Sequence, residues 1–403
     1  MKKKVAIIGG GTAGLFLAAF LNTKLYDVTI FEKKYSPGRK FLVAGDGGFN
    51  LTHSEELSTF KSRYTPVSFL DNALEHFGNA DLRAWLLDLG VPTFVGSSGR
   101  VFPEKGIKPI AVLRTIEAHL IKRNVQFKFN KTFTGWDKEN SLEFNSNEII
   151  KSDYVVFALG GSSWKVTGSD GSWLNIFNKM GIDTVPFRSS NCAYQIKWDE
   201  MFIRNHEGKP LKNISISLNN KNQKGEAVVT KFGIEGNAIY GLSPQIQAAL
   251  AVHNEVEVYI DFKPTNNLEN LIQKISDSKS NFTTTLKDKI KLSRTGIDLL
   301  KTTLTKEAFL DIQTLAKFIK YFPLKIIGSA PIDEAISTSG GVNLHAVDSN
   351  FELKKLKNHF CIGEMLDWDA PTGGYLIQAS ASMGVYLAHQ LNNKLSGIFS
   401  ETL

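Results

Sequence analysis

The start of the chain constrains the fold more than any other segment. Val5–Ile8 is a short apolar run, typical of a buried parallel strand. Gly9-Gly-Gly-Thr-Ala-Gly14 follows, a G-x-G-x-x-G pattern, and residues 15–21 are apolar on all faces, as in a buried helix. Asp27–Phe31 predicts a second strand, which ends at Glu32. Strand, glycine turn, helix, strand and acid in this order predict an α/β fold that begins with a Rossmann-type unit.

Each glycine of this unit has its own role in binding a dinucleotide. Gly9 makes the tight turn, Gly11 lets a pyrophosphate approach the backbone, and Gly14 lets helix and strand pack closely. The helix then presents free N–H groups and a partial positive charge to the phosphates. Glu32, 18 positions after Gly14, can accept from both ribose hydroxyls and would repel a 2′-phosphate. A lone G-x-G-x-x-G can be a turn without function, but the complete pattern predicts NAD or FAD rather than NADP.

A second glycine-rich stretch, Gly38–His53, reads GRKFLVAGDGGFNLTH. Flavoproteins often add a second cofactor-contacting segment soon after the ribose-binding acid. Arg39 and Lys40 would then meet phosphate oxygens, Gly45–Gly48 would lie against the ribityl chain or flavin ring, and Asn50 would hydrogen-bond there. A surface loop with a solvated basic pair explains the same residues equally well. This stretch alone therefore leaves NAD and FAD open.

Later segments favour FAD, the longer dinucleotide. Asp153–Gly161 is an apolar strand that runs into a double glycine, after a β-rich stretch, Val125–Ile150, that predicts a meander. His359–Glu364 is another strand, and it ends in Gly-Glu. Thr372–Ser380 then opens an apolar helix rich in small residues.

Together these segments resemble the BaiN-like family of bacterial NAD(P)/FAD-dependent oxidoreductases, flavoproteins of the two-dinucleotide-binding-domain type. The resemblance covers nearly the whole chain and rests on a combination of motifs. These are GGGTAG (9–14), Glu32, residues 38–53, ALGGSSW (158–164), TKFGIEGNAIY (230–240), STSGGVNLHAVD (337–348) and GEMLDWDAPTGGYLIQASASMG (363–384). One departure is notable. Many members read Gly-Gly-Gly-Arg-Cys-Asn where this chain has Asp46-Gly-Gly-Phe-Asn50, so any role of that cysteine or arginine is absent here.

The resemblance implies a glutathione-reductase-like, Rossmann-type FAD-binding domain that carries an inserted β-domain and a helical segment. It also implies non-covalent FAD, with NAD(P)H as a candidate transient reductant. Catalytic residues stay unassigned, and no metal site is expected. The candidate cofactor-binding residues are Gly9, Gly11, Thr12, Ala13, Gly14, Glu32, Lys33, Arg39, Lys40, Gly48, Asn50, Leu51, Ala158, Gly160, Gly161, Gly363, Glu364, Gly373, Gly374, Tyr375 and Leu376.

The expected domain organisation is discontinuous. Residues 1–190 and 328–403 form the two parts of the FAD-binding domain, and residues 191–327 are inserted between them. The second half of the insert, residues 266–321, predicts helices with few glycines. The first half predicts a small β-domain, with strands over 214–218, 226–231 and 256–262.

Most of the positive charge lies in the helical half of the insert. Residues 263–325 contain 12 Lys and Arg against 6 Asp and Glu, a net charge of +6 within a chain total of +7. A solvated helical face is the plainer explanation, and an acidic substrate or an RNA surface is the sharper one. Because we identify no aromatic or base-reading elements there, nucleic acid is not expected as a partner.

The cysteine spacing, the apolar runs and the number of glycine-rich units argue against several functional classes. Cys192 and Cys361 form no CxxC, zinc or disulfide framework, which disfavours a disulfide reductase and suits a reducing cytoplasm. Glycines 9–11 interrupt the N-terminal apolar run, unlike a signal peptide, and no segment has the roughly 18 consecutive apolar residues of a membrane span. No second strand-G-x-G-x-x-G-helix unit appears. NAD(P)H would therefore have to reach the flavin through a cleft under the insert.

Three functions remain open. The first is an FAD-dependent oxidoreductase, reduced by NAD(P)H or by its substrate, that acts on an unidentified small organic molecule such as an unsaturated or carbonyl compound. The second is an RNA-associated flavoprotein that uses the basic helical insert, and the third is a non-catalytic flavin-binding protein. Flavin performs the redox chemistry itself, so the protein's task is to position and tune it. Oligomeric state is left open.

Candidate cleft residues are all aromatic, and each fits a core position equally well. They are Trp164, Tyr240, Trp368 and Tyr375. His53 lies beside the glycine loop and is attractive as an acid or base. A lone histidine is more often structural, however, so His53 is left out of the catalytic set.

Overall fold

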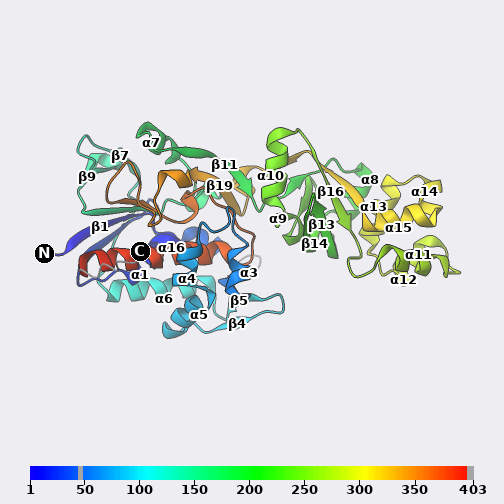
Figure 1. Cartoon of the computed structure of the whole chain (residues 1–403), viewed down its shortest axis with the longest axis horizontal. Helices are drawn as coiled ribbons and strands as arrows, with labels where there is room; N and C mark the ends of the chain where they lie inside the picture. The colour runs from blue at the N-terminus through cyan, green and yellow to red at the C-terminus, as the bar shows by residue number, and fades with distance from the viewer. Residues whose placement is uncertain (44–48, 397–403) are drawn as a thin grey trace. The chain divides into compact units, whose positions relative to one another are not determined.

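The computed structural model describes residues 1–43 and 49–396, and its contacts divide the chain into two compact units (Figure 1). Unit 1 comprises Met1–Arg188 and Ser337–Leu403, and unit 2 comprises Ser189–Ile336. Each unit has its own hydrophobic core, as expected of a domain. The predicted contact Gly48 lies outside the described residues.

Unit 1 is built on a five-stranded parallel sheet with the strand order β20-β10-β1-β2-β6. The central strand β1 (Lys3–Ile8) pairs with β2 (Tyr26–Phe31) on one side and with β10 (Tyr154–Phe157) on the other. The outer strands are β6 (Gln126–Lys128) and β20 (His359–Cys361). This is the Rossmann-type sheet that the sequence predicts.

The centre of this sheet is buried on both faces. Val5–Ile8 of β1 are at most 1% exposed, which explains why the strand is a continuous apolar run. Helix α1 (Thr12–Phe20) follows β1 and is buried from Ala13 to Ala19. The long helix α16 (Tyr375–Ser396) runs beside α1 (Figure 1). A Cβ at Gly384 would lie 2.6 Å from the Ala13 carbonyl oxygen, so a residue without a side chain permits this close approach.

Two small antiparallel sheets complete unit 1. The first is the meander of β7 (Phe133–Trp136), β8 (Leu142–Phe144) and β9 (Glu148–Ile150). The predicted meander over Val125–Ile150 was therefore too long, because its first strand, β6, joins the parallel sheet. The second sheet has the order β3-β5-β4, with β3 at Thr52–His53, β4 at Thr93–Val95 and β5 at Arg100–Pro103.

The remaining elements of unit 1 are mostly short helices. They are α2 (Arg39–Val43), α3 (Leu57–Lys61), α4 (Asp71–His76), α5 (Asn79–Asp88), α6 (Pro109–Lys122), α7 (Leu174–Lys179), and the strand pair of β11 (Thr184–Ser190) with β19 (Ser337–Val342).

Unit 2 is built on a seven-stranded antiparallel sheet with the order β17-β16-β13-β14-β15-β12-β18. Its longest strands form a hairpin in which Leu218 pairs with Lys221, and Asn219 in the turn has a φ of 51°, a conformation that asparagine tolerates. The strands are β12 (Tyr194–Gln195), β13 (Pro210–Leu218), β14 (Lys221–Thr230), β15 (Gly233–Glu235), β16 (Val256–Asp261), β17 (Phe322–Ile326) and β18 (Gly328–Ser329).

Unit 2 has helices over the predicted range 266–321, but three more, α8–α10, lie in the half for which only strands were predicted. Its helices are α8 (Glu200–His206), α9 (Asn237–Tyr240), α10 (Ser243–Val252), α11 (Leu268–Ser276), α12 (Phe282–Asp288), α13 (Arg294–Thr303), α14 (Lys306–Leu310) and α15 (Ile312–Lys320). In each of the last five, a polar side chain before the helix accepts a hydrogen bond from a backbone N–H of the first turn. These caps are Asn267, Asn281, Ser293, Thr305 and Asp311.

Three negative findings apply to residues 1–43 and 49–396. None of the helices in these ranges is long and apolar enough to span a membrane. The same ranges contain no cluster of His, Cys, Asp or Glu suited to a metal ion. Cys192 and Cys361 are both buried and are not joined in a disulfide, and burial raises the pKa of the Cys361 thiol well above its usual value.

Candidate functional site

The predicted site residues of unit 1 gather at the carboxyl edge of the parallel sheet, where strands of such folds bind ligands. Gly9–Gly14 follow β1, Glu32 and Lys33 follow β2, and Ala158–Gly161 follow β10. Gly363 and Glu364 follow β20, and Gly373–Leu376 form the start of α16. Segments hundreds of residues apart in the chain therefore share one edge.

The glycine turn after β1 combines close packing with open space. Gly9 has a φ of 110°, and a Cβ there would lie 2.2 Å from the carbonyl oxygen of Ala158. A Cβ at Gly14 would lie 2.2 Å from the Gly9 carbonyl oxygen. A Cβ at Gly11, in contrast, would meet no described atom within 4 Å. Gly11 precedes Thr12 and Ala13 in the first turn of α1, so the described residues leave space for a ligand beside the helix N-terminus.

Glu32 is anchored to the glycine turn. Its Oε2 accepts a hydrogen bond from the Gly10 N–H at 2.8 Å, and its Oε1 accepts one from the Lys34 N–H at 2.8 Å. Burial raises the pKa of this carboxyl, and the N–H donors offset only part of that shift. Each oxygen has a second lone pair, which a hydroxyl donor can use. The neighbouring Lys33 pairs with Asp170 at 2.9 Å.

Lys40 and Glu364 form an ion pair between α2 and the end of β20. The Lys40 Nζ lies 2.8 Å from the Glu364 Oε2 and also donates to the Ser163 hydroxyl at 2.8 Å. Glu364 Oε1 accepts from the Thr338 N–H at 3.1 Å. The two predicted contacts are thus brought together, and Glu364 partly neutralises the lysine.

Arg39 is the neighbouring cation, and it has a different environment. Its guanidinium lies 4.6 Å from the centre of the Tyr35 ring. Its Nε is buried and has no hydrogen-bond partner among the described residues. A buried donor without an acceptor is costly, and an oxygen atom of a ligand would relieve that cost.

Two further glycine turns pack against the same region. A Cβ at Gly161 would lie 2.1 Å from the Thr338 hydroxyl oxygen, and the Gly160 carbonyl accepts from the Trp173 ring N–H at 3.1 Å. A Cβ at Gly363 would lie 2.9 Å from the Cβ of Ala13, which places the end of β20 against the start of α1. Trp368 donates to the Gly363 carbonyl and is 3% exposed, so it occupies a core position.

Helix α16 begins where the β3-β5-β4 sheet approaches it. Gly374 has a φ of 101°, and a Cβ there would lie 2.5 Å from the Thr52 backbone. Gly373 lies beside Arg100, whose Nε is 3.3 Å from the position of a Cβ on that glycine. No acidic residue occurs in the first turn of α16. The predicted residues Asn50 and Leu51 lead into β3, and Leu51 is 2% exposed.

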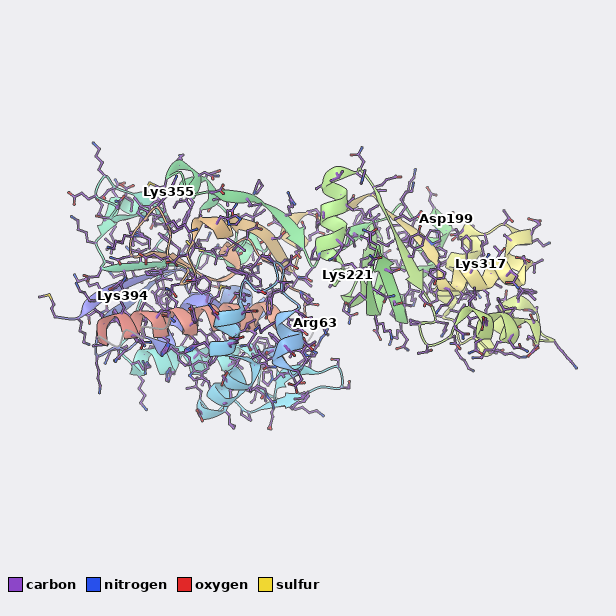
Figure 2. All side chains as sticks on the ribbon, in the orientation of Figure 1. Arg63, Asp199, Lys221, Lys317, Lys355 and Lys394 are labelled. Carbon is purple, nitrogen blue, oxygen red and sulfur yellow. The ribbon has the colours of Figure 1, made fainter. Side chains whose placement is uncertain are left out.

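Tyr375 ties the first turn of α16 to a carboxylate. Its hydroxyl donates to the Glu55 Oε1 at 2.7 Å, and Arg63 donates to both Glu55 oxygens, at 3.1 and 2.8 Å. Arg63, labelled in Figure 2, lies just after α3. Burial alone would raise the pKa of Glu55, but the hydrogen bonds from Arg63 and Tyr375 outweigh it and leave that pKa lowered. Burial and the carboxylate raise the pKa of Tyr375, which stays protonated at neutral pH.

His53 uses both ring nitrogens within the protein. Its ring stacks on Tyr375 with centroids 5.5 Å apart. Its Nδ1 accepts from the Glu55 N–H at 3.2 Å, so Nε2 carries the hydrogen and donates to the Ser98 carbonyl at 3.0 Å. Both ring nitrogens of His53 are therefore engaged within the protein.

The chain is similar over nearly its whole length to a protein family and to curated relatives. The model of the HI0933-like protein Rossmann domain matches residues 3–390. The chain belongs to the HI0933-like family. Curated relatives include the ribosomal RNA dihydrouridine synthase of Haemophilus influenzae, 26% identical over 92% of this chain and 94% of that protein. Another is the 3-dehydro-bile acid delta(4,6)-reductase of Clostridium scindens, 26% identical over 96% of this chain and 98% of that protein.

A solved structure shares the fold of this HI0933-like chain. The 3-ketosteroid delta1-dehydrogenase of Sterolibacterium denitrificans matches with a TM-score of 0.51 and 11% identity, over 98% of this chain and 100% of that one. The likeness concerns the fold alone.

Sequence reasoning missed several residues at the start of α16. Thr52, Glu55, Arg63 and Arg100 all lie in or beside the small β3-β5-β4 sheet, whose strands have two to four residues. Strands this short carry no usable alternation, so nothing local in the sequence places these side chains beside Gly373 and Tyr375.

Proposed function

We propose that this HI0933-like protein is an FAD-dependent oxidoreductase that reduces a carbon–carbon double bond conjugated to a carbonyl group. The observation that carries the proposal is the open space at Gly11, in front of the α1 N-terminus and beside the anchored carboxylate of Glu32. A dinucleotide needs this combination for its pyrophosphate and ribose.

The residues around this space fit FAD. Gly11, Thr12 and Ala13 would hold the pyrophosphate through backbone N–H groups, and Glu32 would accept from the ribose hydroxyls. The Nε of Arg39, which has no hydrogen-bond partner among the described residues, would be a further donor for this part of the cofactor.

The flavin half would lie between the other strand ends and α16. Glu364, held by Lys40 and the Thr338 N–H, would meet ribityl hydroxyls. The start of α16, Gly373–Leu376, would meet the ring, where free N–H groups favour negative charge.

When bound and reduced, FAD would supply a hydride to one carbon of the double bond while a proton goes to the other, and NAD(P)H is the proposed donor that would restore the reduced cofactor. The residues of the chain orient the cofactor and hold charge around it. Tyr375 keeps its phenolic proton because its pKa is raised, and Glu55 fixes that hydroxyl at 2.7 Å. This hydrogen bond between Tyr375 and Glu55 holds the first turn of α16 in place beside Arg63 and His53.

The substrate class is proposed from what the two relatives share. One is named for reducing delta(4,6) double bonds of a 3-dehydro bile acid and the other for making dihydrouridine in ribosomal RNA. Both reactions saturate a carbon–carbon bond conjugated to a carbonyl. We favour a small molecule, because the basic residues of unit 2 are adequately explained as a solvated helical face.

Anaerobic reduction tests the proposal. The purified full-length protein should be yellow, should release FAD on denaturation, and should be bleached by NADH or by NADPH. A panel of cyclic enones and dienones should then restore the oxidised spectrum and gain two hydrogen atoms by mass spectrometry. In a parallel experiment, the reduced protein is incubated with ribosomal RNA transcripts. Formation of dihydrouridine there would show that the substrate is RNA rather than a small molecule. Protein that neither contains nor binds FAD refutes the proposal, and FAD that no donor reduces would favour a non-catalytic role.

A further inference from the structure

Arg100 occupies an unusual position at the start of α16. It is the first residue of β5 and pairs across the sheet with His53. Its Nε lies 3.3 Å and its Cγ 3.9 Å from the position of a Cβ on Gly373. The arginine side chain therefore runs along the turn that leads into a 22-residue helix.

This position is electrostatically unfavourable without an anion. The N-terminus of a long helix carries a partial positive charge and attracts anions rather than cations. No acid lies in the first turn of α16, and the side chain of Arg100 has no hydrogen-bonded or ion-paired partner within residues 1–43 and 49–396. The nearby Glu55 is already occupied by Arg63 and Tyr375. A charge arrangement that breaks a general rule in this way points to a function.

A second group at the same helix start lacks a partner. Thr52 is 0% exposed, and its hydroxyl has no hydrogen-bond partner among the described residues. Its backbone is in close contact with Gly374, since a Cβ on that glycine would lie within 2.6 Å of three Thr52 backbone atoms. A cation, a hydroxyl and helix N–H groups thus lie at one helix start with no acceptor among the described residues, an arrangement that suits an electron-rich oxygen or nitrogen edge.

We propose that Arg100, together with the α16 N-terminus, contacts the N1–C2 carbonyl edge of the flavin and stabilises the negative charge which that edge gains on reduction. The inference rests on the proposed function, because it requires FAD in this site. A hydride from NAD(P)H brings two electrons and one proton, so the neutral ring becomes an anion. Arg100 is always charged, and its planar donor fork suits a carbonyl beside a ring nitrogen. Its role is to make reduction of the flavin easier.

The test compares Arg100→Gln and Arg100→Lys in the FAD-loaded full chain. Loss of the charge should weaken the preference for the reduced form about tenfold, which equals about 30 mV lower midpoint potential for a two-electron couple. Affinity for sulfite, which adds to oxidised flavin and places negative charge on the ring, should fall by a similar factor. Arg100→Lys should retain most of both properties. Arg114→Gln, an exposed change on α6 that removes the same net charge, should leave both unchanged.

The outcomes separate the two proposals. Wild-type protein without FAD overturns the proposed function and this inference together. An FAD-loaded Arg100→Gln with wild-type potential and sulfite affinity overturns the inference alone, as does a lysine variant that behaves like the glutamine variant. If Arg100→Gln loses FAD while Arg100→Lys retains it, the charge contact is supported, because both variants shorten the same side chain.

Discussion

Five helices of unit 2 and two helices of unit 1 begin in opposite ways. In unit 2, helices α11–α15 are each capped by a polar side chain of the chain itself. In unit 1, α1 begins at Gly11 without a side-chain cap, and α16 begins after Gly373 and Gly374, which have no side chains. A capped helix end is complete without a ligand, whereas an open one leaves its N–H groups for another partner. The two open helix starts of unit 1 fit the proposed cofactor site.

The most severe test of this contrast is a matched pair of glycine substitutions in unit 1. Gly9→Ala places a Cβ 2.2 Å from the Ala158 carbonyl at a φ of 110°, so it should lower the free energy of unfolding by about 2–5 kcal/mol. Gly11→Ala meets no described atom and should change stability by less than about 1 kcal/mol, yet weaken FAD binding. Urea unfolding and FAD titration of the apoprotein measure the two effects. Equal stability of both variants would contradict the assigned roles.

The next largest effect is expected on FAD binding, when the carboxylate of Glu32 at the end of β2 is removed. Glu32→Ala removes charge-assisted hydrogen bonds to the ribose, so FAD binding should weaken by about 1.5–3 kcal/mol, or about ten- to hundredfold. Glu269→Ala, at the exposed start of α11 in unit 2, is the matched control and should not change it. Unchanged affinity in the Glu32 variant would place the ribose elsewhere.

The parts of unit 1 that the sequence predicts are those specified by adjacent residues. β1, the glycine turn and β2 form one continuous pattern, and each is found where that pattern places it. The strands before Gly160 and Gly363 are likewise marked by local apolar runs. Neighbouring residues carry enough information here because a buried parallel strand must be apolar throughout.

Other features depend on residues far apart in the chain. Lys40 and Glu364 are 324 positions apart, and Tyr375 and Glu55 are 320 apart, so neither pair leaves a local trace. The three-residue strand β6 has no pattern that separates it from the meander that follows, and for this reason its sheet was assigned wrongly. Tertiary packing decides such cases.

A smaller loss of stability is expected when a helix cap in unit 2 is removed. Ser293 accepts from the Gly296 N–H at 3.1 Å, so Ser293→Ala should lower stability by about 0.5–2 kcal/mol. FAD content should not change, because the cap belongs to a unit without proposed cofactor contacts. Ser276→Ala, at the exposed end of α11, should have almost no effect. Thermal unfolding with parallel measurement of flavin content compares them.

A pH-dependent effect on the free energy of unfolding, of similar or smaller size, is expected when Glu55 is replaced. Its folded-state pKa lies below the ordinary value of 4.5, so its ionised form stabilises unit 1 at neutral pH. This contribution should be lost as the pH falls below about 4.5 and through the folded pKa. Arg63 is 43% exposed, and solvent screening keeps the contribution near about 1 kcal/mol. Glu55→Gln should therefore be less stable than wild type at pH 7, and urea titrations should show the difference shrinking in acid. A constant difference would contradict the ion-pair assignment.

The smallest effect on stability and FAD binding is expected when lysines on the basic surface of unit 2 are replaced. Lys287, Lys289 and Lys291 are exposed residues in and after α12, and changing all three to Gln lowers the formal net charge from +7 to +4. Surface substitutions away from caps and buried pairs shift stability by about 0.5 kcal/mol or less each. Because every proposed cofactor contact lies in unit 1, the triple variant should bind FAD like wild type, and added salt should not change that result. A folded triple variant that has lost FAD would show that the charge of unit 2 contributes to the cofactor site, and the contrast between a ligand-holding unit and a self-contained one would then fail.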